Sequence, residues 1–351
     1  MQVCVVGGGL AGSLLAWRLA QRDVAVTIAV GSAGVSDATG VSGGSVRAFE
    51  VDRAQRSLAI DSMAELLADP RLIEWAGYVE CGSVYLPRTV DGVADIDATL
   101  PGSASVVDAA ALRRAGWAGL DDTVVGVYER RAGYVSPAGL RRNVLADLAQ
   151  RRITLLNQGF VSEVGPGFVV SAGTQQQFDL VVVAAGAWTP GLLTESGFSA
   201  HGLTTKGIQY TLHQATGGPT TAFVDDLSDL FGRPTPDGLL LGLPTEAWGI
   251  APTVPAPDPA LSRRAAALAS YRFPTLQLHS ASTPATAVDC YAPDHLLALR
   301  PVTDRLFSFS GGSGGSVKTA LAASDRAAQQ LLSDPSATLL DHQPELERST
   351  S

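Results

Sequence analysis

Cysteine is scarce in this chain, and its three residues lie far apart at Cys4, Cys81 and Cys290. No two of them form the closely spaced pairs that bind zinc or exchange disulfides. The sequence therefore predicts no disulfide framework, no metal site and no dithiol redox centre. The five histidines are equally scattered and lack metal-ligand spacing. We predict a protein without a bound metal that works in a reducing compartment, the cytoplasm.

The chain also lacks an excess of positive charge and any long hydrophobic run. A formal net charge of −9 argues against nucleic acid or an anionic membrane surface as a partner. No apolar run reaches the ~18 residues of a transmembrane helix. An apolar strand begins at Gln2, which leaves no room for a signal peptide. With 351 residues, 46% of them hydrophobic, the chain is long enough for two domains.

The first dozen residues, MQVCVVGGGLAG, carry the most informative pattern in the chain. An apolar strand over Gln2–Val6 leads into Gly7, Gly9 and Gly12, and an apolar-rich helix is predicted over 13–22. Glycines at these positions allow a tight turn, the approach of a pyrophosphate to the backbone, and close packing of helix on strand. The phosphates would then lie on the N–H groups of the helix N-terminus. The pattern predicts a bound dinucleotide.

The order of the remaining elements predicts an α/β chain in which two domains interleave. The glycine-rich stretch 31–47 suits a loop whose backbone, at Gly43 and Gly44 in particular, lies close to a ligand. The apolar run 178–185 suits a buried parallel strand. Apolar residues at helical spacing predict a helix over 51–67 that ends before Asp69, and Ser136 is the predicted cap of another helix with Pro137 at its first position. The predicted boundaries are 1–76, 131–190 and 285–335 for the nucleotide-binding domain, 77–130 and 191–284 for a second domain with an antiparallel sheet, and 336–351 for a polar tail.

Four places together resemble the D-amino-acid oxidase superfamily, above all its glycine oxidase and sarcosine oxidase branch. They are the glycine turn at 7–12, GYVSP at 133–137, FDLVVVAAGAW at 178–188 and GGSGGS at 311–316. The resemblance covers roughly residues 1–335. It implies a Rossmann-like FAD-binding domain interleaved with a substrate domain built on an antiparallel sheet, with the substrate over the flavin ring between the two.

The resemblance implies cofactor contacts along the whole chain, from the phosphates at the first glycines to the pyrimidine end of the flavin at the last. The residues it implies are Gly7, Gly9, Gly12, Gly43, Gly44, Val161, Ala185, Gly186, Trp188, Cys290, Gly311, Gly312, Ser313, Gly314, Gly315 and Lys318. Reduced flavin carries negative charge near its pyrimidine edge. Backbone N–H groups at a helix start and the ammonium of Lys318 would stabilise that charge.

On the substrate side, the resemblance implies catalytic roles for Lys318, Arg47 and Glu50. Arg47 falls where sarcosine oxidase-like enzymes place an arginine over the flavin near the substrate, and a guanidinium can hold a carboxylate through two hydrogen bonds. A surface-loop arginine is the alternative. Glu50 stands where those enzymes have a second arginine. A carboxylate there would repel an amino-acid carboxylate and could receive an ammonium, which favours a larger or differently charged amine.

Three further positions leave the cofactor chemistry open. Cys290 in DCYAPD resembles the cysteine that tethers FAD in some sarcosine oxidase relatives, although an isolated cysteine is more often a buried free thiol. Val30 stands where the family has a glutamate that binds the ribose. Leu240 stands where sarcosine oxidase has the lysine credited with oxygen activation, so oxidase and dehydrogenase both remain open.

The mechanism that this resemblance implies is hydride transfer from the carbon next to a neutral amine to flavin N5, giving an imine that hydrolyses in water. Such chemistry needs no protein nucleophile, in keeping with the lack of a Ser-His-Asp or Cys-His set. His295 remains a candidate acid or base. The expected partner is a small amine or amino acid. The alternative is a flavoprotein dehydrogenase or maturation factor that acts on a larger or protein-borne substrate without efficient use of oxygen. The oligomeric state is left open.

Overall fold

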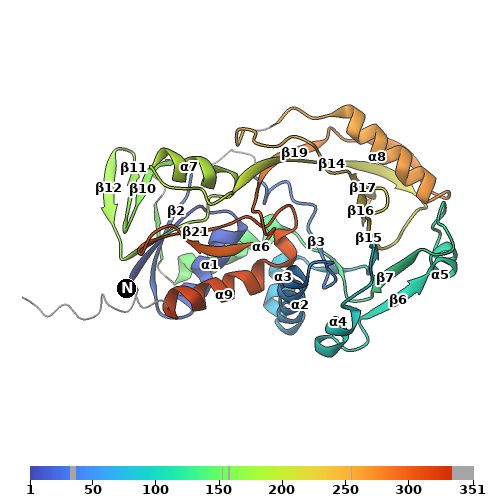
Figure 1. Cartoon of the computed structure of the whole chain (residues 1–351), viewed down its shortest axis with the longest axis horizontal. Coiled ribbons are helices and arrows are strands. Elements are labelled where there is room, and N and C mark those ends of the chain that lie inside the picture. The colour runs from blue at the N-terminus through green and yellow to red at the C-terminus, as the bar shows by residue number, and fades with distance from the viewer. Residues whose placement is uncertain (32–36, 152, 157–158, 254, 334–351) are drawn as a thin grey trace, which may run out of the picture.

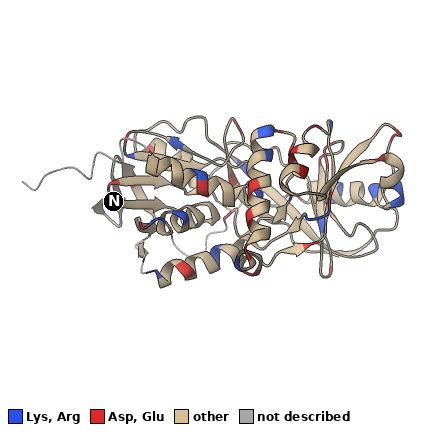
Figure 2. Ribbon diagram, turned by 90° about the horizontal axis from the view of Figure 1, so that it is seen from below, with Lys and Arg blue, Asp and Glu red and all other residues tan. Residues whose placement is uncertain are grey.

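The structure is a computed structural model that describes residues 1–31, 37–151, 153–156, 159–253 and 255–333. The predicted polar tail, 336–351, lies outside these residues. Among the described helices, none is long and apolar enough to cross a membrane. Acidic and basic residues are both spread over the length of the ribbon (Figure 2).

A mostly parallel sheet of six strands forms the first half of the fold (Figure 1). In spatial order its strands are β20 (Ala298–Pro301), β21 (Leu306–Ser310), β13 (Leu180–Val183), β1 (Gln2–Val6), β2 (Ala25–Ala29) and β9 (Thr154–Leu156). β20 alone runs antiparallel to its neighbour. The central strands β1 and β13 are the apolar runs that the sequence predicted, because both of their faces are covered.

Side chains of β1 alternate between two hydrophobic cores. Val3 and Val5 pack with helices α1 (Leu10–Ala20), α6 (Pro137–Gln150) and α9 (Ala320–Ser333) on one face. Cys4 and Val6 pack on the other face with α7 (Thr189–Glu195) and with the three-stranded sheet of β10 (Val161–Gly165), β11 (Phe168–Ser171) and β12 (Thr174–Gln177). This layered arrangement confirms the predicted Rossmann-like domain.

The second half of the fold is a large, mainly antiparallel sheet. In spatial order its strands are β18 (Gln277–Ala281), β14 (Thr204–Thr216), β17 (Gly238–Gly242), β16 (Leu230–Thr235), β15 (Ala222–Asp225), β5 (Ser83–Leu86), β7 (Val125–Glu129) and β6 (Ala104–Asp108). Helix α8 (Pro259–Arg272) lies along its outer side, where Gln209 of β14 donates to the carbonyl of Asp258 (Figure 1). Strands from 77–130 and 191–284 thus share one sheet, as the interleaved fold requires.

One strand departs from the predicted division of the chain. The sequence placed residues 285–335 with the nucleotide-binding domain, but β19 (Ala285–Tyr291) pairs with β14 along its whole length. The short apolar stretch could not reveal this, because strand partners are set by tertiary contacts and not by local pattern. We propose that the domain boundary follows Tyr291.

The remaining α-helices and a small sheet complete the described fold. They are α2 (Arg53–Ala68), α3 (Pro70–Ala76), α4 (Val93–Thr99), α5 (Ala109–Arg114), and a small sheet of β3 (Ser45–Val46), β8 (Gly133–Tyr134) and β4 (Val79–Glu80). The helix predicted to end before Asp69 does so. However, Asp69 caps a further helix, α3, with Pro70 at its first position, which the sequence analysis missed. The predicted Ser136 cap of α6 is confirmed by the bond from the Gly139 N–H.

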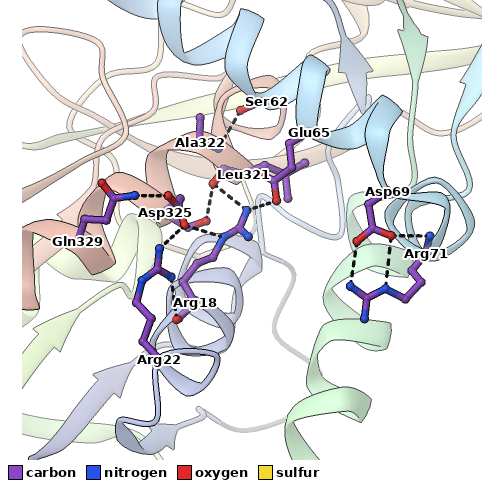
Figure 3. Close-up of polar contacts among 11 residues, drawn as sticks. Arg18, Arg22, Ser62, Glu65, Asp69, Arg71, Leu321, Ala322, Asp325 and Gln329 are labelled. Atoms are coloured by element: carbon purple, nitrogen blue, oxygen red, sulfur yellow. Dashed lines mark hydrogen bonds and ion pairs between the residues drawn. The ribbon is translucent and has the colours of Figure 1, made fainter.

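A polar cluster around Arg18 joins the first helix, α1, to α2 and to the last described helix, α9 (Figure 3). The buried Arg18 guanidinium of α1 donates to Glu65 of α2 at 2.5 Å and to the Leu321 carbonyl of α9 at 3.3 Å. Asp325 of α9 lies 3.8 Å from Arg18 Nε and 2.6 Å from Arg22. The cluster therefore fixes α1 relative to α9, which follows the C-terminal glycine loop.

Replacing Arg18 with alanine is expected to lower the free energy of unfolding by about 2 kcal/mol, because charged hydrogen bonds and stem packing are both lost. Arg71→Ala is the control, since its pair with Asp69 is exposed and is expected to contribute less than about 0.5 kcal/mol (Figure 3). Urea unfolding of the two variants gives the comparison. Equal losses would show that the Arg18 cluster does not join the helices as described.

Candidate active site

A cavity of about 1560 Å³ lies where the two halves of the fold meet. Its walls are the first strand-to-helix turn, the loop before β3, the residues after β13, the inner side of β14 and β17, and the loop before α9. Small-molecule sites usually measure roughly 300–1,000 Å³. The cavity therefore has room for a large cofactor and a second small molecule together.

Most of the predicted site residues line this cavity. They are Gly7, Gly9, Gly43, Gly44, Arg47, Val161, Ala185, Gly186, Trp188, Cys290, Gly311, Gly312, Ser313, Gly314, Gly315 and Lys318. Gly12 packs behind the turn, and Glu50 lies behind Arg47 and Lys318. Within the described parts of the chain, no group of three or more His, Cys, Asp or Glu side chains is placed to hold a metal ion.

Glycine is favoured at the three opening positions for different physical reasons. A Cβ on Gly7 (φ +122°) would lie 2.3 Å from the Ala184 carbonyl oxygen, and one on Gly12 would lie 2.1 Å from the Gly7 oxygen. Gly7 and Gly12 are therefore required by the packing of β1, β13 and α1. Gly9 has an extended backbone that any residue adopts, and its Cβ would meet only the Thr39 hydroxyl, at 3.5 Å. The protein alone does not require glycine at position 9.

The space beside Gly9 fits a phosphate group. Gly9 is the N-cap of α1 and has no side chain to cap the helix, so helical geometry leaves the N–H groups of Ala11 and Gly12 without an intrahelical acceptor. Such a helix start binds anions. The Leu10 N–H is held by the Thr39 hydroxyl at 3.0 Å. Sequence reasoning missed Thr39, because nothing local marks a contact between residues 29 positions apart.

At the far end of the cavity, the glycine loop before α9 is fixed onto β19. Gly311 and Gly314 adopt φ of +99° and +75°. The Gly314 N–H donates to the Asp289 carboxylate at 3.0 Å, and the Cys290 N–H donates to the same carboxylate at 2.8 Å. Burial raises the pKa of Asp289. Asp289 also lines the cavity and was missed by the sequence analysis, although it directly precedes the predicted Cys290.

The three predicted catalytic residues form one buried cluster. The carboxylate oxygen Oε1 of Glu50 lies 2.7 Å from a terminal nitrogen of Arg47 and 3.0 Å from Nζ of Lys318. Each of the three side chains is about nine-tenths buried. Two basic side chains thus share one carboxylate beside the cavity.

Charge interactions set the protonation states of this cluster. Burial alone would raise the pKa of Glu50, but the charges of Arg47 and Lys318 outweigh burial and hold that pKa below its ordinary value. Burial lowers the pKa of Lys318, and the Glu50 charge offsets part of this shift. For Arg47, the neighbouring carboxylates outweigh burial and raise the pKa. Glu50 is therefore a carboxylate and Arg47 a guanidinium at neutral pH.

The loop that carries the cluster is fixed by buried partners. Glu129 of β7 accepts the N–H groups of Ala48 and Phe49 at 2.8 and 3.0 Å. Arg56 donates to the Glu50 carbonyl at 2.7 Å. The Arg47 guanidinium lies 4.9 Å from the centre of the Tyr85 ring. Glu129 and Tyr85 come from the second half of the fold, so no local pattern could have identified them.

The antiparallel sheet supplies a largely apolar wall. Along β14, side chains at alternate positions are half-buried on the cavity side, while Gln209 and Thr211 bond to Ser262 on the α8 side. The apolar and aromatic residues of this wall are Ile208, Tyr210, Phe231, Leu240, Leu243 and Ile250. Lys206 also lines it, with Nζ 4.4 Å from the Trp248 ring.

At the end of the cavity near β2, the position of the predicted ribose contact is occupied by Val30, and none of the described residues 25–31 carries a carboxylate. The Val30 side chain packs over Gly8, and the next described carboxylate, Asp37, is ion-paired with Arg141 of α6. Residues 32–36 lie outside the described chain. Phe160, which is 53% exposed, lies beside Gly31 and next to Val161 on this part of the cavity wall.

Two further candidates are Cys290, for which a buried free thiol was the more common expectation, and His295. Cys290 lines the cavity but is only 2% exposed and packs with Leu203 and Ala292. Burial raises its pKa to about 12, so its sulfur is a neutral thiol at physiological pH. His295 is exposed, bonds to the Ser313 hydroxyl and is not part of the cavity wall. Neither environment favours acid, base or nucleophilic chemistry.

Comparisons with known proteins agree with this arrangement. A family model described as DAO, FAD dependent oxidoreductase, matches residues 2–330. No curated protein sequence matches the chain. The fold is similar to glycine oxidase from Geobacillus kaustophilus, with a TM-score of 0.75, 19% identity and 94% of each chain covered. It is also similar to L-proline dehydrogenase from P. horikoshii, with a TM-score of 0.73, 17% identity, and 95% of this chain and 93% of that one covered.

A third solved structure with this fold is NikD, described as an unusual amino acid oxidase. Its TM-score is 0.73, with 18% identity, and the alignment covers 95% of this chain and 94% of NikD. At such low identities the structural likeness establishes the fold alone, and the family model carries the assignment of the whole chain.

Proposed function

The chain belongs to the DAO family of FAD dependent oxidoreductases, and from this premise we propose that it oxidises the C–N bond of a small amine or amino acid to an imine. The solved structures that share its fold include an amino acid oxidase and a proline dehydrogenase. The imine would hydrolyse in water to a carbonyl compound and a free amine or ammonia.

One observation carries this proposal. A single cavity joins the uncapped helix start at Gly9 to the buried amino group of Lys318 at its other end. Gly9 tests whether the turn fits a bound pyrophosphate. The protein itself leaves room for a Cβ at this position, but a phosphate held on the helix start would leave none. A Cβ on Gly186 would also meet no protein atom within 4 Å, but the φ of +54° at Gly186 favours glycine by itself, so that position does not provide the same test.

We propose the following roles for the chain's own residues. The N–H groups of Ala11 and Gly12 would hold the pyrophosphate, and the loop from Gly311 to Lys318 would hold the pyrimidine end of the flavin. When bound, FAD supplies the acceptor for a hydride from the carbon that bears the nitrogen. The Lys318 ammonium would stabilise negative charge at that end of the cavity. The wall of β14 and β17 would exclude water around the substrate.

The experiment that tests this function measures the product. FAD-loaded protein is incubated with a panel of primary and secondary amines and with the corresponding amino acids, in the presence of an artificial electron acceptor. A carbonyl product, captured with a hydrazine reagent, is expected with at least one of them. No reduction of the acceptor and no carbonyl product across the whole panel would argue against amine oxidation.

The proposed electron acceptor is a molecule other than oxygen. Leu240, 2% exposed, lines the cavity where the family resemblance predicts a lysine, so no ammonium at that position can stabilise superoxide. Reduced enzyme is expected to reoxidise slowly in air and rapidly with dichlorophenolindophenol. Stopped-flow absorbance of the flavin measures both rates. Faster reoxidation by air than by the dye would identify an oxidase.

We propose that FAD is bound without a covalent link, an outcome that the buried, neutral thiol of Cys290 supports. Acid precipitation of the holoprotein is expected to leave the yellow colour in the supernatant. Cys290→Ser is expected to give the same FAD content as the parent protein. Colour that stays with the precipitated parent and is lost from the Ser variant would establish attachment at Cys290.

A further inference from the structure

The described part of the cavity wall holds four cationic side chains, and each already has a partner. Arg141 is ion-paired with Asp37, and Lys206 lies over Trp248. The other two, Arg47 and Lys318, share Glu50. A substrate carboxylate that entered the cavity would therefore find three of these four described cations already ion-paired, and the fourth, Lys206, over an aromatic ring.

The geometry of Arg47 decides whether the cavity can hold a substrate carboxylate. A guanidinium holds a carboxylate best through two parallel N–H donors. One terminal nitrogen of Arg47 lies 2.7 Å from the Glu50 carboxylate, its Nε donates to the Phe49 carbonyl at 3.2 Å, and its face lies on Tyr85. A second carboxylate could form the two-bond arrangement only by displacing these partners.

Glu50 is held firmly in this position. It is three residues from Arg47 in a loop whose backbone is bonded by Glu129 and Arg56. Its side chain is about nine-tenths buried, so removing one partner would leave an uncompensated buried charge. A substrate carboxylate placed beside it would also meet like-charge repulsion, which is a means of rejecting one class of ligand.

The remaining surface of the cavity favours a neutral or positively charged guest. The carboxylate of Asp289 lines it, and the bonds that this carboxylate accepts come from the backbone N–H groups of Cys290 and Gly314. The wall from β14 and β17 is apolar at Ile208 and Leu240. An apolar body with an amine nitrogen matches this combination.

We propose that Glu50 is a built-in counter-ion that occupies the place on Arg47 needed by the carboxylate of an amino acid. The site consequently takes amines that carry no carboxylate on the carbon that is oxidised. This assignment of substrate class rests on the proposed amine oxidation. The role of Glu50 as a barrier to carboxylates is independent of turnover.

The first test measures binding without chemistry. The FAD-loaded protein is titrated with 3-phenylpropionate, and the visible spectrum of the flavin reports occupation of the cavity. Glu50→Gln keeps the shape of the side chain and removes its charge. It is expected to bind 3-phenylpropionate at least tenfold more tightly than the parent, because Arg47 is released to form charged hydrogen bonds. Equal affinity in the two proteins would overturn the role of Glu50.

Asp226→Asn provides the matched control. Asp226 accepts a bond from the Tyr85 hydroxyl at 2.8 Å, so it is an acidic neighbour of the cluster that does not contact Arg47. Its variant is expected to bind 3-phenylpropionate as weakly as the parent. A single cooperative unfolding transition and the absorption bands of bound flavin verify that each variant is folded. The midpoint of Glu50→Gln is expected to fall, because Arg47 and Lys318 lose their shared carboxylate. A gain in Asp226→Asn equal to that in Glu50→Gln would show that general acidity, not the counter-ion, excludes carboxylates.

The second test compares 2-phenylethylamine with phenylalanine, two compounds that differ only by the carboxylate on the reacting carbon. The parent protein is expected to be bleached anaerobically at least tenfold faster by the amine, and Glu50→Gln is expected to reduce this preference at least tenfold. Faster bleaching of the parent by phenylalanine would overturn the substrate class. If no amine bleaches either protein, the proposed amine oxidation fails, while the 3-phenylpropionate titration still decides the role of Glu50.

Discussion

The Gly9→Ala protein is expected to fold as the parent does and to lose at least 100-fold in affinity for FAD. The backbone of Gly9 is extended, and the new Cβ would meet only the Thr39 hydroxyl at an ordinary contact distance of 3.5 Å. The apoprotein therefore has no reason to be destabilised. The methyl group would hold a pyrophosphate away from the N–H groups at the start of α1. Losing two charged hydrogen bonds of about 1.5 kcal/mol each corresponds to roughly 100-fold in affinity.

Gly12→Ala is the informative comparison for this variant. Its Cβ would lie 2.1 Å from the Gly7 carbonyl oxygen, so α1 would have to move off β1. We expect Gly12→Ala to lower both the unfolding midpoint of the apoprotein and its affinity for FAD. Fluorescence titration of FAD and urea unfolding separate the two effects. A Gly9→Ala protein that binds FAD like the parent would mean that the cofactor does not approach this turn.

The Lys318→Met protein is expected to bind FAD with a lowered reduction potential and to be reduced by substrate roughly 100-fold more slowly. Lys318 is buried, lines the cavity and is the cation closest in sequence to the glycine loop. Removing one preorganised donor from a site of developing negative charge commonly costs ~100-fold or more in rate. A loss of about 2–3 kcal/mol in stabilising the reduced cofactor corresponds to a fall of roughly 40–60 mV for a two-electron couple.

Lys206→Met is the matched control, because it removes the same charge from another part of the same cavity. Lys206 lies over Trp248 on β14 and has no contact with Glu50. Its variant is expected to keep a potential within about 15 mV of the parent, which corresponds to less than about 1 kcal/mol. Dye-equilibrated reduction with xanthine and xanthine oxidase measures both potentials. Equal shifts in the two variants would remove Lys318 from any specific role beside the flavin.

The sequence predicted the parts of the fold that depend on local pattern. The apolar runs of β1 and β13 follow directly from burial on both faces, and the glycine spacing required a strand, a turn and a helix in that order. The start of α6 was also predicted from local sequence, because Ser136 is its cap and Pro137 its first residue. In contrast, the partner of β19 depends on β14, about 80 residues earlier, and the sequence pattern alone did not identify it.

The candidate site shows the same division. Arg47, Glu50 and Lys318 were identified one by one through the family resemblance. The ion pairs that Arg47 and Lys318 both form with Glu50 depend on two loops that are distant in the chain, so the sequence could not predict them. That contact changes the interpretation of Arg47, because a guanidinium already held by Glu50 is poorly prepared to bind a second carboxylate. Glu129 and Thr39 were missed altogether, since each acts on backbone N–H groups far away in sequence.

The visible absorption spectrum of the purified protein, recorded before and during anaerobic addition of an amine, tests the central claim most directly. The protein is expected to bind one FAD per chain, to show the absorption bands of oxidised flavin, and to lose the visible band when an amine is added without oxygen. A protein that stays colourless and shows no affinity for added FAD would contradict the account.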